Sequence, residues 1–301
     1  MRYGAGLNTG KPIADVVEEA KALAASGFSC LSSSHIFGYD AITLLGLVGV
    51  SVPGVELMTA VVPIYTRHPI AMAQQALTVQ AATEGRFVLG IGLSHQVMIE
   101  GVYGMSFAQP LRAMREYLAA LMPLLRRERV SFKGETVAAS AGPLEIDVQA
   151  PPVIVAALGT AMLELAGEVA DGTATWMTGP RTLADHIVPT IKTAAERAGR
   201  LSPRIMAALP VCVTDDVAAA RQRADEVFAI YGTLPSYRAM LDREGAASPG
   251  DAAIVGDETA VRAVLAELGS AGVTDFSPAP IGSREDIQRT RALFRELSQS
   301  A

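Results

Sequence analysis

Short runs of apolar residues alternate with longer amphipathic stretches from one end of the chain to the other. This alternation predicts parallel strands that are each followed by a helix. Eight strands are predicted, at residues 3–8, 28–33, 55–62, 87–93, 153–158, 173–177, 205–213 and 273–281. Helices are predicted at residues 13–25, 41–50, 70–82, 110–127, 162–169, 183–198, 217–230, 260–268 and 285–297.

Two stretches interrupt this rhythm. Residues 130–150 alternate apolar and polar positions around Gly134 and Gly142, which predicts a surface β-hairpin after the fourth helix. Residues 231–251 predict a helical insertion near strands seven and eight. Because no linker divides the chain, the pattern favours an α/β fold, a (β/α)8 TIM barrel in one domain spanning residues 1–301.

The alternative is an open doubly wound sheet, which shows the same alternation. A dinucleotide-binding fold of that kind carries a glycine-rich turn directly after its first strand. Here Gly4 and Gly6 lie within the first predicted strand. The count of eight strands and the missing turn both favour a closed barrel.

Composition narrows the range of partners and compartments. Half of the 301 residues are hydrophobic and the formal charge is −6, so a broad nucleic-acid surface is not expected. Cys30 and Cys212 lie far apart in apolar runs, which predicts buried reduced thiols in a cytoplasmic protein. The most apolar window, residues 41–52, is too short for a bilayer span, so no membrane anchor is expected.

Candidate chemistry is expected where the predicted strands end, because barrel active sites lie at that edge. His35 and His95 both fall there, and a histidine can donate or accept a proton near neutral pH. The alternative is that each only bonds a loop backbone. No nearby carboxylate or cysteine completes a metal site with them.

Other strand ends offer groups suited to a ligand. Gly159 and Thr160 open a predicted helix, where free amides suit a phosphate, although such turns are also common without ligands. Arg67 precedes another helix and is expected to meet either an anionic group or a surface carboxylate. Trp176 and Tyr39 are candidates for the wall of an apolar pocket, and the alternative for both is the core.

Several of these stretches resemble the luciferase-like superfamily, in its branch of F420-dependent oxidoreductases. The resemblance covers essentially the whole chain and is strongest at residues 37–43, 59–69, 85–92, 156–159, 170–172, 176–180, 209–215 and 237–244. It implies a (β/α)8 barrel, which agrees with the strand count. It also implies a bulge with a non-prolyl cis peptide in strand three, at Ala60 and Val61.

The resemblance implies a coenzyme, F420, that exchanges a hydride with a small organic substrate, and it implies a homodimer. Cofactor-binding positions are expected at Asn8, Ser34, Ala60, Val61, Leu93, Ser94, Ala157, Leu158, Gly159 and Thr160. Tyr39, Trp176 and Tyr237 are expected in the substrate pocket, and His35 or His95 at the proton transfer.

The chain departs from the sugar-phosphate dehydrogenases of this branch. Those enzymes carry an Asp-His pair after strand two and a carboxylic acid after strand four, where this chain has Ser34-His35 and His95. Both acidic positions are lost, which argues against a sugar-phosphate substrate. An FMN-dependent monooxygenase and a non-catalytic ligand-binding barrel remain the alternatives.

Overall fold

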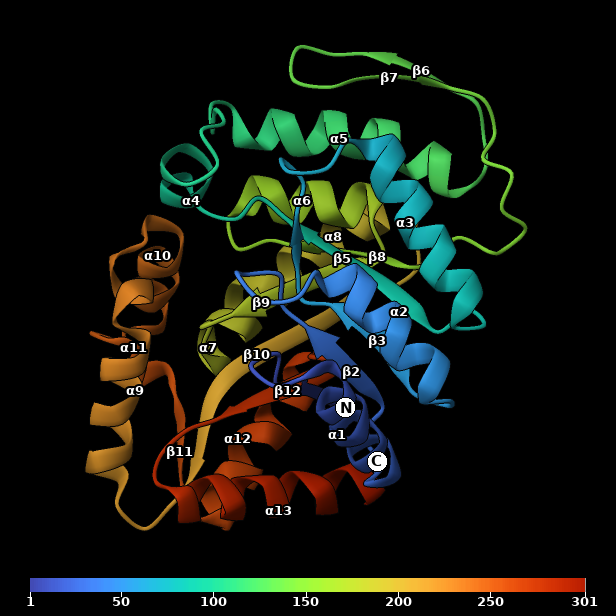
Figure 1. The fold of residues 1–301 in the computed structure, drawn as a ribbon. Helices are drawn as coiled ribbons and strands as arrows, with labels where there is room; N and C mark the ends of the chain where they lie inside the picture. The colour runs from blue at the N-terminus through green and yellow to red at the C-terminus, as the bar shows by residue number, and fades with distance from the viewer. Residues whose placement is uncertain (301) are drawn as a thin grey trace. The chain divides into compact units, whose positions relative to one another are not determined.

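A computed structural model describes residues 1–300 of the chain (Figure 1). The fold is an α/β barrel of eight parallel strands with an additional antiparallel hairpin, as the sequence predicts. Contacts divide the chain into two compact units. Unit 1 contains Met1–Gly6, Ala25–Ser29 and the chain from Ala157 onward, and unit 2 contains Leu7–Ala24 and Cys30–Ala156.

Unit 2 holds four parallel strands in the order β2-β3-β5-β8, with the short β4 also paired to β5. Its elements are α1 (Ile13–Ala25), β2 (Cys30–Ser33), α2 (Ala41–Ser51), β3 (Glu56–Thr59), β4 (Val62–Pro63), α3 (Pro69–Ala82), β5 (Phe87–Gly92), α4 (Gln96–Gly101), α5 (Pro110–Leu125), β6 (Val130–Lys133), β7 (Ala138–Ala141) and β8 (Val153–Ala156). The hairpin β6–β7 lies beside α5 (Figure 1).

Unit 1 holds the strands β11-β10-β12-β1, and β10 also pairs with β9. Its elements are β1 (Arg2–Gly6), α6 (Thr160–Val169), β9 (Gly172–Trp176), α7 (Pro180–Thr182), the π-helix η1 (Leu183–Ile187), α8 (Val188–Arg197), β10 (Arg204–Val213), α9 (Val217–Thr233), α10 (Pro235–Glu244), α11 (Pro249–Ala252), β11 (Ile254–Gly256), α12 (Glu258–Ala271), β12 (Asp275–Pro280) and α13 (Arg284–Ser300). Helices α9, α10 and α11 gather in one group (Figure 1).

Local sequence explains where the helices of unit 2 begin. The Asp40 side chain caps α2 by accepting the Thr43 amide, as an aspartate at this position should. Helix α3 opens at Pro69, whose missing N–H costs nothing in a first turn. Both starts agree with the sequence-based expectation.

Strand three departs from its predicted form as an unbroken run over residues 55–62. It divides into β3 and β4, and the peptide between Ala60 and Val61 is cis, as the family resemblance implies. At the break, the Thr59 hydroxyl donates to the Gly90 carbonyl at 2.7 Å and accepts the Gly90 amide at 2.8 Å. A side chain therefore replaces main-chain pairing at the end of β3.

Other predicted elements need correction. The helix predicted at 183–198 is wrong as one element, because Pro189 has no N–H to donate and the preceding turn widens into η1. Helix α4 and strand β11 were not predicted. Both are short: α4 has six residues and β11 has three, so neither carries a clear hydrophobic period.

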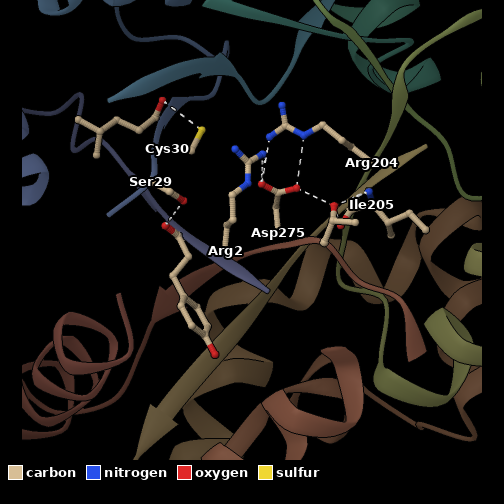
Figure 2. A network of polar contacts seen from close by, with 9 residues as sticks. Arg2, Ser29, Cys30, Arg204, Ile205 and Asp275 are labelled. Carbon is tan, nitrogen blue, oxygen red and sulfur yellow. Dashed lines mark hydrogen bonds and ion pairs between the residues drawn. The ribbon is translucent and has the colours of Figure 1, made fainter. Parts of the chain in front are cut away.

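A buried carboxylate joins the starts of three strands in unit 1 (Figure 2). The Asp275 side chain at the start of β12 is 4% exposed and lies 2.5 Å from an Arg2 guanidinium nitrogen of β1. Arg204 of β10 approaches the same carboxylate at 3.0 Å, and the Thr274 hydroxyl donates to it at 2.6 Å. This network lies at the strand starts, where barrel residues support stability.

Cys30 and Cys212 are both buried and neither forms a disulfide, as predicted. Within residues 1–300, no helix is long and apolar enough to cross a membrane.

Replacement of Asp275 by Ala should lower the free energy of unfolding by about 3 kcal/mol, because two guanidinium groups lose their buried partner. Urea unfolding followed by circular dichroism measures this loss. The matched control is Asp147→Ala, which removes a fully exposed partner of Arg127 and should leave the free energy of unfolding nearly unchanged. Equal losses in the two variants would contradict the role given to Asp275.

Candidate functional site

The carboxyl ends of the unit 2 strands bring together Ser34 and the Ala60–Val61 peptide. The Ser34 hydroxyl donates to the Ala60 carbonyl at 2.9 Å, and the Ala60 amide donates to the Ser33 carbonyl at 2.9 Å. The tip of β2 therefore holds the backbone at the gap between β3 and β4. Of the expected cofactor positions, Ser34, Ala60 and Val61 form one connected group.

Two glycines of β5 make room for this arrangement. A Cβ on Gly90 would lie 1.9 Å from the Thr59 carbonyl oxygen, and a Cβ on Gly92 would lie 2.8 Å from a Val61 methyl carbon. Only glycine at both positions leaves space for the end of β3 and for the Val61 side chain. Residues Thr59, Gly90 and Gly92 were not assigned to the site from sequence, although the Gly-Ile-Gly tip was a visible signal.

His35, just beyond β2, lies against two charged side chains. Its Nδ1 accepts the Ala41 amide at 3.4 Å and lies 3.6 Å from the Asp40 Oδ2 atom. Arg67 forms an ion pair with that same Asp40 oxygen. Burial, and next the Arg67 charge, hold the pKa of His35 below its ordinary value, against the opposing effect of Asp40.

Asp40 is the partner that sequence reasoning did not connect to His35. The structure shows Asp40 also as the cap of α2. The expectation that Arg67 pairs with a carboxylate is confirmed, and the carboxylate is that of Asp40. Five residues after His35, the loop places a carboxylate beside the histidine.

His95 occupies a different local setting. It precedes α4, where its carbonyl accepts the amides of Met98 and Ile99 at 2.9 Å each. Burial lowers the pKa of His95. The preceding Ser94 has a φ of 59°, a left-handed conformation that turns the chain directly after β5 and Leu93.

The remaining candidates of unit 2 are less connected. Asn8 closes a turn, because its side-chain oxygen accepts the Gly10 amide at 3.1 Å. Tyr39 is 36% exposed in the loop before α2, beside the more exposed Ile36 and Phe37. This loop presents apolar side chains to solvent within the described part of unit 2.

In unit 1, the segment from Ala157 to Thr160 leads into α6. Gly159 precedes the helix without a side-chain cap, and a Cβ placed there meets no atom within 4 Å. His186 of η1 lies with its Nε2 atom 2.8 Å from the Leu158 carbonyl oxygen. The His186 side chain therefore fixes the backbone at Leu158, while the space beside Gly159 is open. An open helix start of this kind suits an anionic group.

Four aromatic rings form a cluster in unit 1. Trp176 at the end of β9 lies 5.3 Å from Phe228 and 5.9 Å from Tyr231, measured between ring centroids. Tyr231 lies 4.9 Å from Tyr237, and burial raises the pKa of Tyr237. The expected pocket residues Trp176 and Tyr237 are thus joined through Tyr231, which sequence reasoning left out.

A cavity of about 270 Å³ opens within unit 2. The loop after β4, helix α5 and the hairpin line it, with Tyr65, Arg67, His68, Tyr117 and Val137 among its walls. Glu116 of α5 fastens the hairpin wall by accepting the amides of Glu135, Thr136 and Val137 and the Thr136 hydroxyl. Its carboxylate thus serves as a fixed anchor for the turn.

Among residues 1–300, no cluster of His, Cys, Asp or Glu side chains is arranged to hold a metal ion. The groups described above instead offer main-chain surfaces, an open helix start, imidazoles and aromatic rings. The groups of unit 2 suit a flat organic ring, and the open helix start of unit 1 suits a phosphate.

The family model described as luciferase-like monooxygenase matches residues 1–287. A "5,10-methylenetetrahydromethanopterin reductase" of Methanolobus tindarius is 26% identical over 81% of this chain and 75% of its own length. A "Putative coenzyme F420-dependent oxidoreductase" of Mycobacterium tuberculosis is 29% identical over 89% of this chain and 91% of its own length.

One solved structure illustrates the similarity of fold. The coenzyme F420 dependent tetrahydromethanopterin reductase from Methanopyrus kandleri aligns with a TM-score of 0.82 over 99% of this chain and 97% of that chain. The sequence identity in that alignment is 21%, so the likeness establishes the fold alone.

The Glu116 anchor should respond to acid. Hydrogen bonds from Thr136 and from neighbouring amides lower the pKa of Glu116 to about 2, below its ordinary value of 4.5. Its stabilising contribution is therefore complete above pH 4.5 and is lost as the pH falls through about 2. The Thr136 amide resonance should report this titration in NMR spectra.

Glu116→Gln should abolish that titration and increase hydrogen exchange at the hairpin turn at neutral pH. The exposed Glu145 follows the hairpin, so Glu145→Gln is the matched control and should leave the Thr136 resonance unchanged. A Thr136 amide that titrates near pH 4.5 in the unmodified protein would refute the anchor.

Proposed function

This chain belongs to the luciferase-like monooxygenase family, and we propose that it is a coenzyme F420-dependent oxidoreductase that transfers a hydride between the deazaflavin and a small organic substrate. The observation that carries the proposal is similarity along nearly the whole length to a protein of M. tuberculosis whose name states that coenzyme. The reductase of M. tindarius adds a second relative with an oxidoreductase name.

The residues of unit 2 fit the support of a flat ring. Main-chain atoms of Ala60 and Val61 interrupt the sheet, and Ser34 holds the Ala60 carbonyl in place. Gly90 and Gly92 allow this backbone to pack closely on β5. When bound, the deazaflavin supplies or accepts a hydride at a ring carbon, and these residues would orient the ring. Asn8, Leu93 and Ser94 are proposed to border it.

The residues of unit 1 fit a phosphate. Ala157, Leu158, Gly159 and Thr160 form the segment before and at the start of α6, and the exposed Thr160 adds a hydroxyl. A ten-residue helix presents unpaired amides and a partial positive charge at its first turn. The open space at Gly159 supports approach of an anion to those amides.

His35 and His95 are the proposed proton carriers. Burial lowers the pKa of both imidazoles, so each is neutral at neutral pH and able to accept a proton. A hydride transfer to or from a polar bond requires such a group to balance the charge at the heteroatom. Tyr39, Trp176 and Tyr237 are proposed to contact the organic part of the substrate.

An FMN-dependent monooxygenase is the second candidate, because the family description names monooxygenase activity. An open helix start that suits the phosphate of one flavin-like cofactor also suits that of the other. The two candidates therefore differ in the ring and its reactivity, and a direct binding comparison separates them.

Fluorescence titration of the purified apoprotein should show saturable binding of F420 and much weaker binding of FMN. Thr160→Glu places a negative charge at the α6 start and should weaken F420 binding at least about tenfold, because like charges repel. Val217→Glu makes the same change at the start of α9 and is the matched control.

Tight FMN binding without a response to F420 would overturn the first proposal in favour of the monooxygenase. Equal weakening by Thr160→Glu and Val217→Glu would remove the α6 start from the proposed phosphate site.

A further inference from the structure

Three side chains from two loops of unit 2 meet beyond the ends of β2 and β4: His35, Asp40 and Arg67. We infer that Asp40 is the carboxylate that positions His35 and stabilises its protonated form during turnover. This inference rests on the proposed oxidoreductase function. Asp40 is thus a positioning residue that acts through His35.

The two oxygens of Asp40 have separate partners. Oδ1 accepts the Thr43 amide at 2.9 Å and the Thr43 hydroxyl at 2.8 Å, which caps α2. Oδ2 faces His35 Nδ1 at 3.6 Å and forms the ion pair with Arg67. Because the cap fixes the carboxylate, Oδ2 is held toward the imidazole before any ligand arrives.

The contacts at Nδ1 define the resting tautomer of His35. Nδ1 accepts the Ala41 amide at 3.4 Å, so the neutral ring carries its hydrogen on Nε2. In the imidazolium, the hydrogen on Nδ1 points at an acceptor, and Asp40 Oδ2 is the anionic oxygen beside that nitrogen. Asp40 therefore gives the charged ring a partner that the Ala41 amide cannot provide.

Arg67 limits how strongly Asp40 acts. The charged groups that act on His35 are Asp40, at the start of α2, and Arg67, from the loop before α3. Arg67 opposes protonation of the imidazole, whereas Asp40 favours it. The side chains of His35 and Arg67 are 16% and 13% exposed, so water screens their interaction with Asp40 only in part. Asp40 therefore offsets part of the effect that burial and Arg67 have on the imidazolium.

The pair favours substrates whose reduction takes up one hydride and one proton, such as a carbonyl compound or an imine. Bound F420 would supply the hydride to the substrate carbon, and the heteroatom would then need a proton as the π bond breaks toward it. That heteroatom takes the proton from Nε2 of the imidazolium, which leaves the ring with its hydrogen on Nδ1 toward Asp40 Oδ2. Proton exchange with solvent then restores the resting tautomer, in which Nδ1 accepts the Ala41 amide. In the reverse direction, the ring with its hydrogen on Nδ1 would remove the proton of an alcohol or amine at Nε2, and oxidised F420 would accept the hydride.

NMR titration of the histidine ring protons in the apoprotein tests the pair without cofactor or substrate. Asp40→Asn preserves a good helix cap but removes the charge, and it should lower the pKa of His35 by about one unit. Arg67→Met removes the opposing charge and should raise that pKa. The matched control Asp257→Asn makes the same change at the cap of α12 and should leave His35 unchanged.

Activity with F420 supplies the second readout. In the direction of substrate reduction, the pH at which kcat falls should move downward in Asp40→Asn, in parallel with the NMR value, whereas the affinity for F420 should be retained. The affinity for F420 separates this inference from the proposed function, because loss of F420 binding in the unmodified protein would overturn the function alone.

A His35 titration that is the same in unmodified protein, Asp40→Asn and Arg67→Met would overturn the inference. A shift of equal size in Asp257→Asn would do the same, because the change would then reflect a lost charge anywhere in the molecule. Opposite shifts in Asp40→Asn and Arg67→Met, with no shift in the control, would support it.

Discussion

The hydroxyl of Thr59 is the contact on which the arrangement of the candidate site depends. It donates to and accepts from the main chain of Gly90, and so replaces the ladder at the point where β3 ends. Ordinary pairing would continue the strand and keep every amide of this segment within the sheet. With Thr59 in place, the backbone of Ala60 and Val61 leaves the ladder while its buried neighbours remain satisfied.

The opposite ends of the strands show a different solution to the burial of polar groups. At Asp275 the partners are full charges, and the carboxylate links β1, β10 and β12. The attraction between the buried carboxylate and two guanidinium groups is strong, and it fixes the starts of these strands relative to one another. At Thr59 the partners are neutral and the groups are small, so the chain can shape a surface without introducing charge beside a ligand.

Much of the fold could be predicted because local signals and long-range order agree. Asp40 and Pro69 mark helix starts, and the apolar runs mark most strands within a few residues. The failures have physical causes. The Thr59 hydroxyl takes the place of main-chain pairing, and such a contact leaves no periodic pattern in the sequence. Strand β11 has three residues, which are too few to show a period. Pro189 was visible in the sequence as a residue that disturbs a helix. The hydrophobic period on both sides of it nevertheless continues as in one helix, so the π-helix η1 before it was not predicted.

The candidate site was predictable in its positions more than in its contacts. Strand ends identified Ser34, His35 and the Ala157–Thr160 segment, since topology alone collects such residues at one edge. The pairing of His35 with Asp40 depends on how a short loop returns on itself, and the link from His186 to Leu158 spans 28 residues. Neither the contact between His35 and Asp40 nor that between His186 and Leu158 follows from a sequence pattern.

The chain has only four histidines, and each belongs to a different structural segment. His68 joins α3 to the hairpin, because one ring nitrogen accepts the Ile70 amide and the other lies 2.8 Å from the Ala138 carbonyl oxygen. His186 supports the segment before α6, while His35 and His95 follow β2 and β5. The protein therefore carries natural reporters at its hairpin, its proposed anion loop and two strand ends, and they allow local rearrangement to be followed without an added label.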